Sequence, residues 1–107
     1  MNTISESDWK IFRRLSAVAL DRHCINSLRM VRDITDDATL TNHQRYQKLF
    51  GLLHDRDKEV AQAFDNPRRS VAFEQLFIIC SWGLLTNAEL SEFSEGIRER
   101  IKFLLGE

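Results

Sequence analysis

The stretch between residues 71 and 82 constrains the fold more than any other part of this sequence. It reads VAFEQLFIICSW, so apolar side chains would surround a helix there on nearly every side. A continuous apolar run can be a buried strand or a buried helix. Two features favour a helix over residues 67–83: the length of the segment and the preceding Asn66-Pro67. Asn66 suits a helix cap, and proline suits the first turn of a helix. Such a helix must lie at the centre of a bundle or be covered by a second chain.

Two longer amphipathic helices are predicted before this segment, over residues 7–34 and 42–65. In both, apolar residues recur at intervals of three, four and seven, the spacing of one helical face. In the second helix these residues are Tyr46, Leu49, Phe50, Leu53, Val60 and Phe64. The connection TDDATLT is short and rich in turn formers, so we expect an antiparallel hairpin.

Two short helices are predicted after the apolar segment, with Thr86 and Ser94 as their capping residues and Gly83 as the stop before them. The chain holds four Gly and one Pro, and this scarcity of turn residues also favours helices. We therefore expect an all-α fold: a small helical bundle of four to five helices, forming one domain over residues 1–107.

The charge balance of the 107 residues excludes a global attraction to nucleic acid or to an anionic membrane. Fifteen Lys/Arg and sixteen Asp/Glu give a net charge of −1. The longest unbroken apolar run, Leu76–Cys80, is far below the ~20 residues of a membrane span. The first residues show no basic start followed by an apolar run, so we expect no secretory signal. These features predict a soluble cytoplasmic protein without a membrane partner.

Two charged residues fall on stripes that the hairpin is expected to bury. Arg22 lies on an apolar stripe of the first helix, and Asp57 lies on the main stripe of the second. An isolated charge on a buried face is costly, so each residue needs a partner. We therefore predict that Asp57 pairs with Arg22, or failing that with Arg68 or Arg69.

The residues able to bind a metal lack the spacing of a known site. They are His23, Cys24, His43, His54, Asp55 and Asp57. Di-iron sites in bundles use Glu-x-x-His pairs, and the residues three before the histidines are Leu20, Leu40 and Gly51. No HExxH pattern and no Cys/His spacing for structural zinc is present. We therefore expect neither a metal nor a cofactor.

No catalytic constellation is evident around the two cysteines. Cys24 follows His23, but adjacent helical residues point about 100° apart and are poorly placed to act as nucleophile and base. Cys80 lies in the apolar segment, where a thiol stays protonated. Both cysteines are interpreted as buried free thiols in a reducing cytosol. The sequence also lacks a Gly-x-Ser-x-Gly motif and a glycine-rich phosphate loop, so we predict no catalytic residue and disfavour an enzyme.

Arg68 and Arg69 stand near the predicted start of the apolar helix, with Ser70 after them. Arginines at a helix N-terminus can hold a phosphate. The cluster holds only two charges and acidic residues lie nearby, so a solvated surface is the favoured interpretation. Contact with nucleic acid through Arg68 and Arg69 stays an alternative.

The surplus apolar surface of residues 67–83 predicts association with another chain. Phe73, Phe77 and Trp82 are its large aromatic residues, a type enriched in interfaces. The other interpretation is that this helix is simply the centre of the core. Our leading hypothesis is a non-enzymatic module that contacts itself as a homodimer, or another protein. The alternatives are a small regulator that contacts nucleic acid, and a ligand carrier or enzyme with a pocket between helices, although no small-molecule ligand is evident.

Three stretches of the chain, RDKEVAQAF, FDNPRRS and GLLTNAELSEFS, resemble parts of small helical bacterial proteins of similar length and unknown role. The likeness spans most of the chain. It implies a bacterial cytoplasmic origin, and it carries no activity, cofactor or site residue to this sequence.

Overall fold

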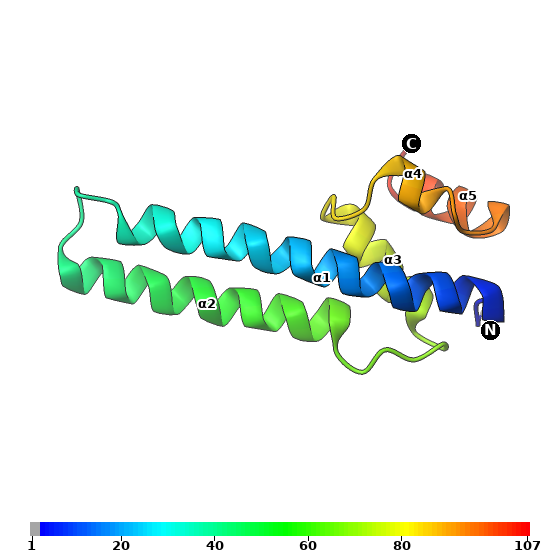
Figure 1. Cartoon of the computed structure of the whole chain (residues 1–107), viewed down its shortest axis with the longest axis horizontal. Helices are drawn as coiled ribbons and strands as arrows, with labels where there is room; N and C mark the ends of the chain where they lie inside the picture. Colours follow the sequence, from blue (N-terminus) through cyan, green and yellow to red (C-terminus); the bar gives the residue numbers. More distant parts are fainter. Residues whose placement is uncertain (1–2) are drawn as a thin grey trace.

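The computed structural model describes residues 3–107, which form five α-helices and contain no strand (Figure 1). The helices are α1 (Glu6–Thr35), α2 (Asn42–Phe64), α3 (Ala72–Ser81), α4 (Asn87–Leu90) and α5 (Glu95–Leu104). This confirms the predicted all-α fold, a small helical bundle. The molecule measures 51 × 26 × 22 Å, because α1 and α2 run far beyond the other three helices.

The helices α1 and α2 form the predicted antiparallel hairpin. At the start of α2, the Gln44 amide donates to the Thr41 hydroxyl, and the Gln44 side chain accepts from the Thr41 amide. This capping box satisfies two backbone donors that a helix end leaves free. The Arg45 guanidinium closes the connection by donating to the carbonyl oxygens of Asp37 and Leu40, at 2.6 and 2.8 Å.

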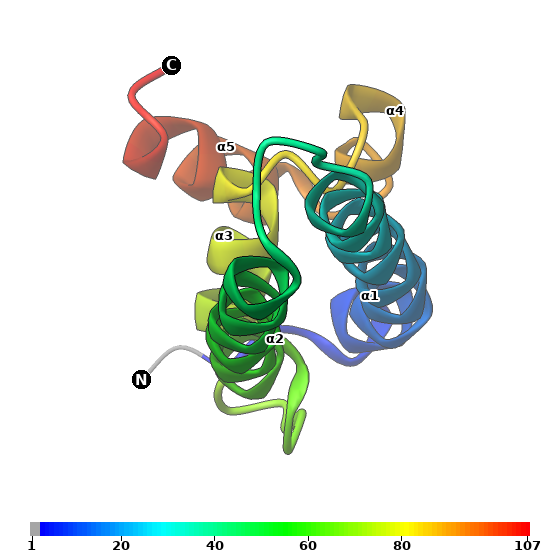
Figure 2. The same cartoon turned by 90° about the vertical axis from the view of Figure 1, so that its left-hand side faces the viewer.

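The molecule divides into a compact end and a hairpin arm (Figure 1), and Figure 2 looks along the arm towards the compact end. The compact end comprises residues 3–24 and 60–107, where α3, α4 and α5 gather around the first part of α1 and the end of α2. The hairpin arm comprises residues 25–59, where α1 and α2 continue side by side beyond the other helices.

The apolar core lies entirely in the compact end. Its members in the described chain are Ile4, Phe12, Leu15, Ala19, Ala63, Phe64, Ala72, Phe73, Leu76, Ile79, Leu84, Phe93, Ile97 and Ile101. They come from the first part of α1, the end of α2, α3, α5 and the segments around α4. Burial of these side chains is the main force that holds the C-terminal helices on the hairpin.

The turn before α3 replaces the helix start that the sequence predicted there. α3 begins at Ala72 instead of residue 67. Asn66 has a φ of 48°, in the left-handed region, so the chain bends at Asn66 and does not begin a helix there. A turn follows before α3, in which the Val71 amide donates to the carbonyl oxygen of Arg68 at 3.0 Å. Gln75 stabilises the bend, because its Nε2 donates to the carbonyl oxygen of Asp65 at 2.9 Å.

The chain itself covers α3 on nearly every side. Between residues 71 and 82, only Glu74 and Ser81 are exposed. The other sides pack against α1, α2 and α5. The exclusion of water predicted for this segment is therefore confirmed, and this chain's own helices provide it. The apolar surface of α3 gives no reason to invoke a second chain.

Two carboxylates fasten the C-terminal helices to α1. Asp8, which is 3% exposed, accepts hydrogen bonds from the amide and the Oγ of Ser94, at 2.9 and 2.7 Å. Asp8 thereby ties Ser94, the N-cap residue of α5, to α1. The Arg22 guanidinium binds both carboxylate oxygens of Glu89 at 2.6 and 2.9 Å, and donates to the carbonyl oxygen of Leu84 at 2.8 Å.

The predicted pairing of Arg22 with Asp57 is not formed. Arg22 is engaged by Glu89, and this hydrogen bond, with a further one from the Thr86 backbone, lowers the pKa of Glu89 to about 2. Asp57 lies exposed in the arm. Arg69, one of the other expected partners, donates to the carbonyl oxygen of Ile4. The periodicity placed Arg22 and Asp57 on apolar stripes of α1 and α2. It could not show that Arg22 meets α4 in the compact end, whereas Asp57 lies in the arm.

Candidate functional site

A row of side chains on α2 is left open in the arm. We call Tyr46, Phe50, Leu53 and Asp57 the arm face; they follow one another at intervals of four, three and four residues. The exposed fractions of Tyr46, Phe50 and Leu53 are 69%, 67% and 48%. Side chains at these intervals lie along one side of a helix.

The same row is covered where the compact end begins. It continues through Val60, which is half-buried, to Phe64, which is 8% exposed and lies beside the ring of His23. Alternating intervals of three and four are the spacing of a seam along which helices pack. The arm face is therefore the uncovered part of a seam whose other part is already packed.

The arm buries no apolar side chain of its own. Among residues 25–59, all of which the structure describes, Ser27 is the only buried residue, and its hydroxyl donates to the carbonyl oxygen of His23 at 3.0 Å. Ile25 and Leu28 on α1 are 40% and 54% exposed. Because helices in proteins are stabilised mainly by burial of an apolar face, a two-helix arm without a core gains little from its own packing.

Asp57 brings a charge to the arm face. It is exposed and makes no hydrogen bond or ion pair with any residue that the structure describes. It borders a shallow surface hollow together with Phe50, Leu53 and His54. The His54 ring lies parallel to the Phe50 ring, with centroids 6.3 Å apart. The arm face thus combines two aromatic side chains and a leucine with one carboxylate.

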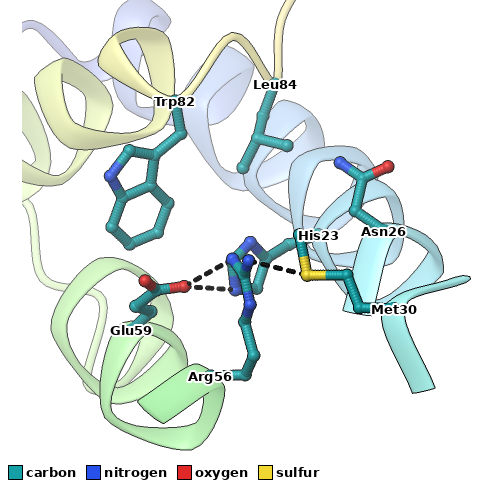
Figure 3. A pocket seen from close by; sticks show the side chains of 7 residues that line it. All are labelled: His23, Asn26, Met30, Arg56, Glu59, Trp82 and Leu84. Carbon is teal, nitrogen blue, oxygen red and sulfur yellow. Dashed lines mark hydrogen bonds and ion pairs between the residues drawn. The ribbon is translucent and has the colours of Figure 1, made fainter. Parts of the chain in front are cut away.

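A pocket of about 350 Å³ lies at the base of the arm, where the segment after α3 meets the hairpin (Figure 3). It is lined by His23, Asn26, Met30, Arg56, Glu59, Trp82 and Leu84. His23 is 3% exposed and stacks on Trp82, with ring centroids 5.3 Å apart. Its Nε2 lies 3.4 Å from a Glu59 oxygen without forming a hydrogen bond. Burial lowers the pKa of His23, and the Glu59 carboxylate only partly opposes this effect.

Arg56 extends across this pocket from α2 (Figure 3). It donates to Glu59 at 2.9 Å and contacts the Met30 sulfur at 2.9 Å. The cation and the anion that line the pocket are therefore paired with each other. The described residues contain no group of three or more His, Cys, Asp or Glu side chains that could hold a metal ion. The arrangement fits a polar joint that fixes α1 against α2 better than it fits a catalytic centre.

The aromatic residues that the sequence marked for association lie in the compact end. Phe73 is 8% exposed and lies under the Arg100 guanidinium, 3.9 Å from its ring centroid. Phe77 and Trp82 are half-buried against the same core. Their packing leaves them little surface to offer a partner, and the large exposed apolar side chains of α2 lie on the arm face instead.

Arg68 and Arg69 are both exposed in the turn between α2 and α3. The Arg69 Nε donates to the carbonyl oxygen of Ile4 at 2.8 Å, which ties this turn to the start of the chain. Because α3 begins only at Ala72, neither arginine occupies its first turn. The two residues therefore do not form the helix-end phosphate site that their sequence position suggested.

The two cysteines differ in exposure. Cys80 is half-buried, and this burial raises its thiol pKa to about 11. Cys24 is exposed, so its interpretation as a buried thiol is wrong. It lies about 100° around α1 from the buried His23, and the wide apolar pattern of this helix concealed its exposure.

Sequence reasoning assigned the arm face to the core. Tyr46, Phe50 and Leu53 share the periodicity of Val60 and Phe64, and periodicity does not reveal which length of a helix is covered. A usable signal was the difference in length, because the helix predicted over 42–65 exceeds the apolar helix predicted to cover it. The part of the longer helix that the apolar helix cannot cover must lie in solvent or against another chain.

A smaller exposed apolar pair ends α5. Phe103 and Leu104 are 80% and 52% exposed, and they border a hollow with Glu99 and Arg100. Leu104 extends the buried row of Ile97 and Ile101 by one position, and Phe103 precedes it in sequence. The arm face is the longer of these two surfaces, since it spans three exposed apolar positions of one row on α2.

Comparison with known proteins assigns no family, because no family model, curated protein or solved structure matches the chain. No helix in the described part of the chain is long and apolar enough to cross a membrane. The function is therefore argued from the geometry of the molecule.

Proposed function

We propose that this chain is a non-enzymatic protein–protein interaction module of the cytoplasm, and that the arm face is its docking surface. The observation that carries the proposal is the change of burial along one row of α2. Phe64 is 8% exposed at the compact end, whereas Phe50 in the same row is 67% exposed. A seam with the 3–4 spacing is completed by a further helix, so the open part fits a helical partner.

The chemistry of the arm face supports docking. Aromatic side chains are enriched where interfaces are fully buried, and the face presents Tyr46 and Phe50 next to each other. If a whole aromatic side chain has ~200 Å², their exposed fractions leave roughly 270 Å² of aromatic surface on one helix side. With Leu53, this area reaches the range of the largest apolar patches on ordinary monomers, which are often functional.

A photo-crosslinking residue tests the docking surface even when the identity of the partner is unknown. In cells that produce the protein, p-benzoylphenylalanine replaces Phe50. In the matched control it replaces Lys48, which is exposed on α2 and, two residues away, points to nearly the opposite side of the helix. We expect one discrete adduct from position 50 and none from position 48 at equal expression. The absence of an adduct from position 50, or equal adducts from both positions, would contradict the proposal.

A further inference from the structure

We infer that the partner is a second copy of this chain, and that two arm faces pair antiparallel about a two-fold axis level with the midpoint between Gly51 and Leu52. The inference rests on the proposed function and names its partner. A two-fold interface uses the same surface on both copies, so that surface must be complementary to itself. The arm face meets this condition.

The positions of the arm face mirror one another along α2. Tyr46 and Asp57 lie at equal distances on the two sides of the midpoint, and so do Phe50 and Leu53. When two such helices run antiparallel in this register, Tyr46 of one copy is level with Asp57 of the other. Phe50 of one copy is likewise level with Leu53 of the other. Each of these pairs occurs twice, once on each side of the axis.

This register gives Asp57 the partner that it lacks within its own chain. The phenolic O–H of Tyr46 donates, and the Asp57 carboxylate accepts. Within one chain the two residues are separated by about 16 Å along the helix axis, at 1.5 Å per residue, and cannot bond to each other. A polar residue in a helical seam selects one register and oligomeric state, because other registers leave it against apolar side chains. Asp57 therefore specifies the alignment of the pair.

A parallel alignment of the two arms is disfavoured by the same residue. In a parallel pair, Asp57 of one copy would lie level with Asp57 of the other, and like charges at such a distance repel. The antiparallel pair separates the two carboxylates to opposite ends of the seam. It also places each of them beside the hydroxyl of a tyrosine that is 69% exposed in the free chain.

The exposed aromatic surface of the arm face supplies about half of the area that a specific pair needs. Two copies together present roughly 540 Å² of exposed aromatic surface from Tyr46 and Phe50. This is about half of the ~1,000 Å² total at which interfaces become specific. Leu53, which is 48% exposed, and the exposed side chains of His43 and His54 on α2 add to this surface. The arms of two copies would then form a four-helix arrangement, the architecture in which hairpins of this kind bury both faces.

Sedimentation equilibrium of the purified full-length chain measures the pairing directly. We expect a monomer–dimer equilibrium, with the dissociation constant raised at least about 100-fold by Phe50→Asp, since two phenylalanines per dimer lose their burial. Lys48→Asp introduces the same side chain on the other side of α2 and leaves the constant within about threefold. Circular dichroism of each variant verifies that the helices are retained.

A charge exchange tests the register. Tyr46→Glu places a carboxylate level with Asp57 of the other copy, and we expect it to raise the dissociation constant by about 100-fold. Adding Asp57→Lys to Tyr46→Glu makes an opposite-charge pair at both ends, and we expect it to recover at least about tenfold of that loss. Adding Asp55→Lys instead makes the same change two residues away, on the opposite side of the helix, and recovers less than about threefold.

The outcomes separate this inference from the proposed function. A strictly monomeric native chain overturns the inference, while a position-50 adduct whose mass is not twice that of the 12.5 kDa chain retains the proposed function with another partner. A dimer that Phe50→Asp weakens, but that the Tyr46→Glu/Asp57→Lys pair does not rescue, overturns the register. A dimer insensitive to Phe50→Asp overturns the inference, because the pair then forms through another surface; the proposed function is decided by the position-50 adduct.

Discussion

The compact end and the hairpin arm are built from the same two helices, yet only the compact end has a core. In the compact end, α3 and α5 lie over the hairpin and enclose side chains such as Phe12, Leu15 and Phe64. In the arm, α1 and α2 keep their helical geometry and their apolar seam, but no third helix lies over them. Caps and apolar spacing therefore determine how far a helix extends, whereas its apolar side chains are buried only where α3 and α5 form a third layer over the hairpin.

The two regions should differ most in how much stability the chain loses when one large apolar side chain is shortened to alanine. Ile101 is fully buried, so Ile101→Ala should lower the free energy of unfolding by about 2–5 kcal/mol through lost transfer energy and a cavity. The matched arm variant Leu53→Ala should lower it by less than about 1 kcal/mol in the dilute monomer, since Leu53 is 48% exposed. Urea unfolding at low protein concentration measures both values. Similar losses in the two variants would break the division into a packed end and an open arm.

An intermediate effect is expected from the contact of Asp8 with Ser94, the N-cap residue that joins α1 to α5. Asp8→Ala removes the acceptor of the Ser94 amide and hydroxyl, and the loss of hydrogen bonds to a charged acceptor costs about 1–2 kcal/mol. The change should raise hydrogen exchange in α5 and leave that of the arm as it was. The conservative Asp8→Asn keeps one acceptor oxygen and should lose less. Equal exchange of α5 in the native chain and in Asp8→Ala would show that this contact does not hold the third layer.

A smaller effect follows from pH. The pKa of Glu89 is about 2 in the folded chain, against an ordinary value of 4.5, because Arg22 and the Thr86 backbone stabilise the carboxylate. As the pH falls, the Glu89 carboxylate is therefore protonated at a lower pH in the folded chain than in the unfolded chain. The contribution of this carboxylate is complete above pH 4.5 and is lost as the pH falls towards 2.

The variant Glu89→Gln isolates this contribution and retains a residue suited to the capping box. We expect its urea midpoint to fall less steeply than that of the native chain between pH 4.5 and 2. Parallel pH profiles in the two proteins would mean that the Arg22–Glu89 contact does not couple α4 to α1 at acid pH.

Much of the fold could be predicted from local sequence signals. The box of Thr41 and Gln44 placed the start of α2, and the box of Thr86 and Glu89 placed the start of α4. The apolar ring of residues 71–82 predicted that water is excluded there. The start of α3 could not be predicted, because the left-handed backbone of Asn66 depends on how α2 and α3 pack, and Asn-Pro suits either a turn or a helix start.

The candidate site could be predicted only in part. Asp57 stood out as a charge within an apolar stripe, but its expected partner was sought inside the chain. The periodicity of Tyr46, Phe50 and Leu53 was correct, although their exposure depends on where the third layer stops. That boundary is set by long-range packing, in which α3 meets the end of α2 and α5 packs on α3.

Hydrogen exchange of the purified chain at low and high protein concentration shows whether a second copy covers the arm. Amides of residues 25–59 should exchange rapidly at low concentration and become protected as the concentration rises. Amides of the compact end should keep the same protection throughout, because their core lies within one chain. Arm amides that are as protected as the compact end at high dilution, with no change on concentration, would contradict the claim that the arm needs a second copy to cover it.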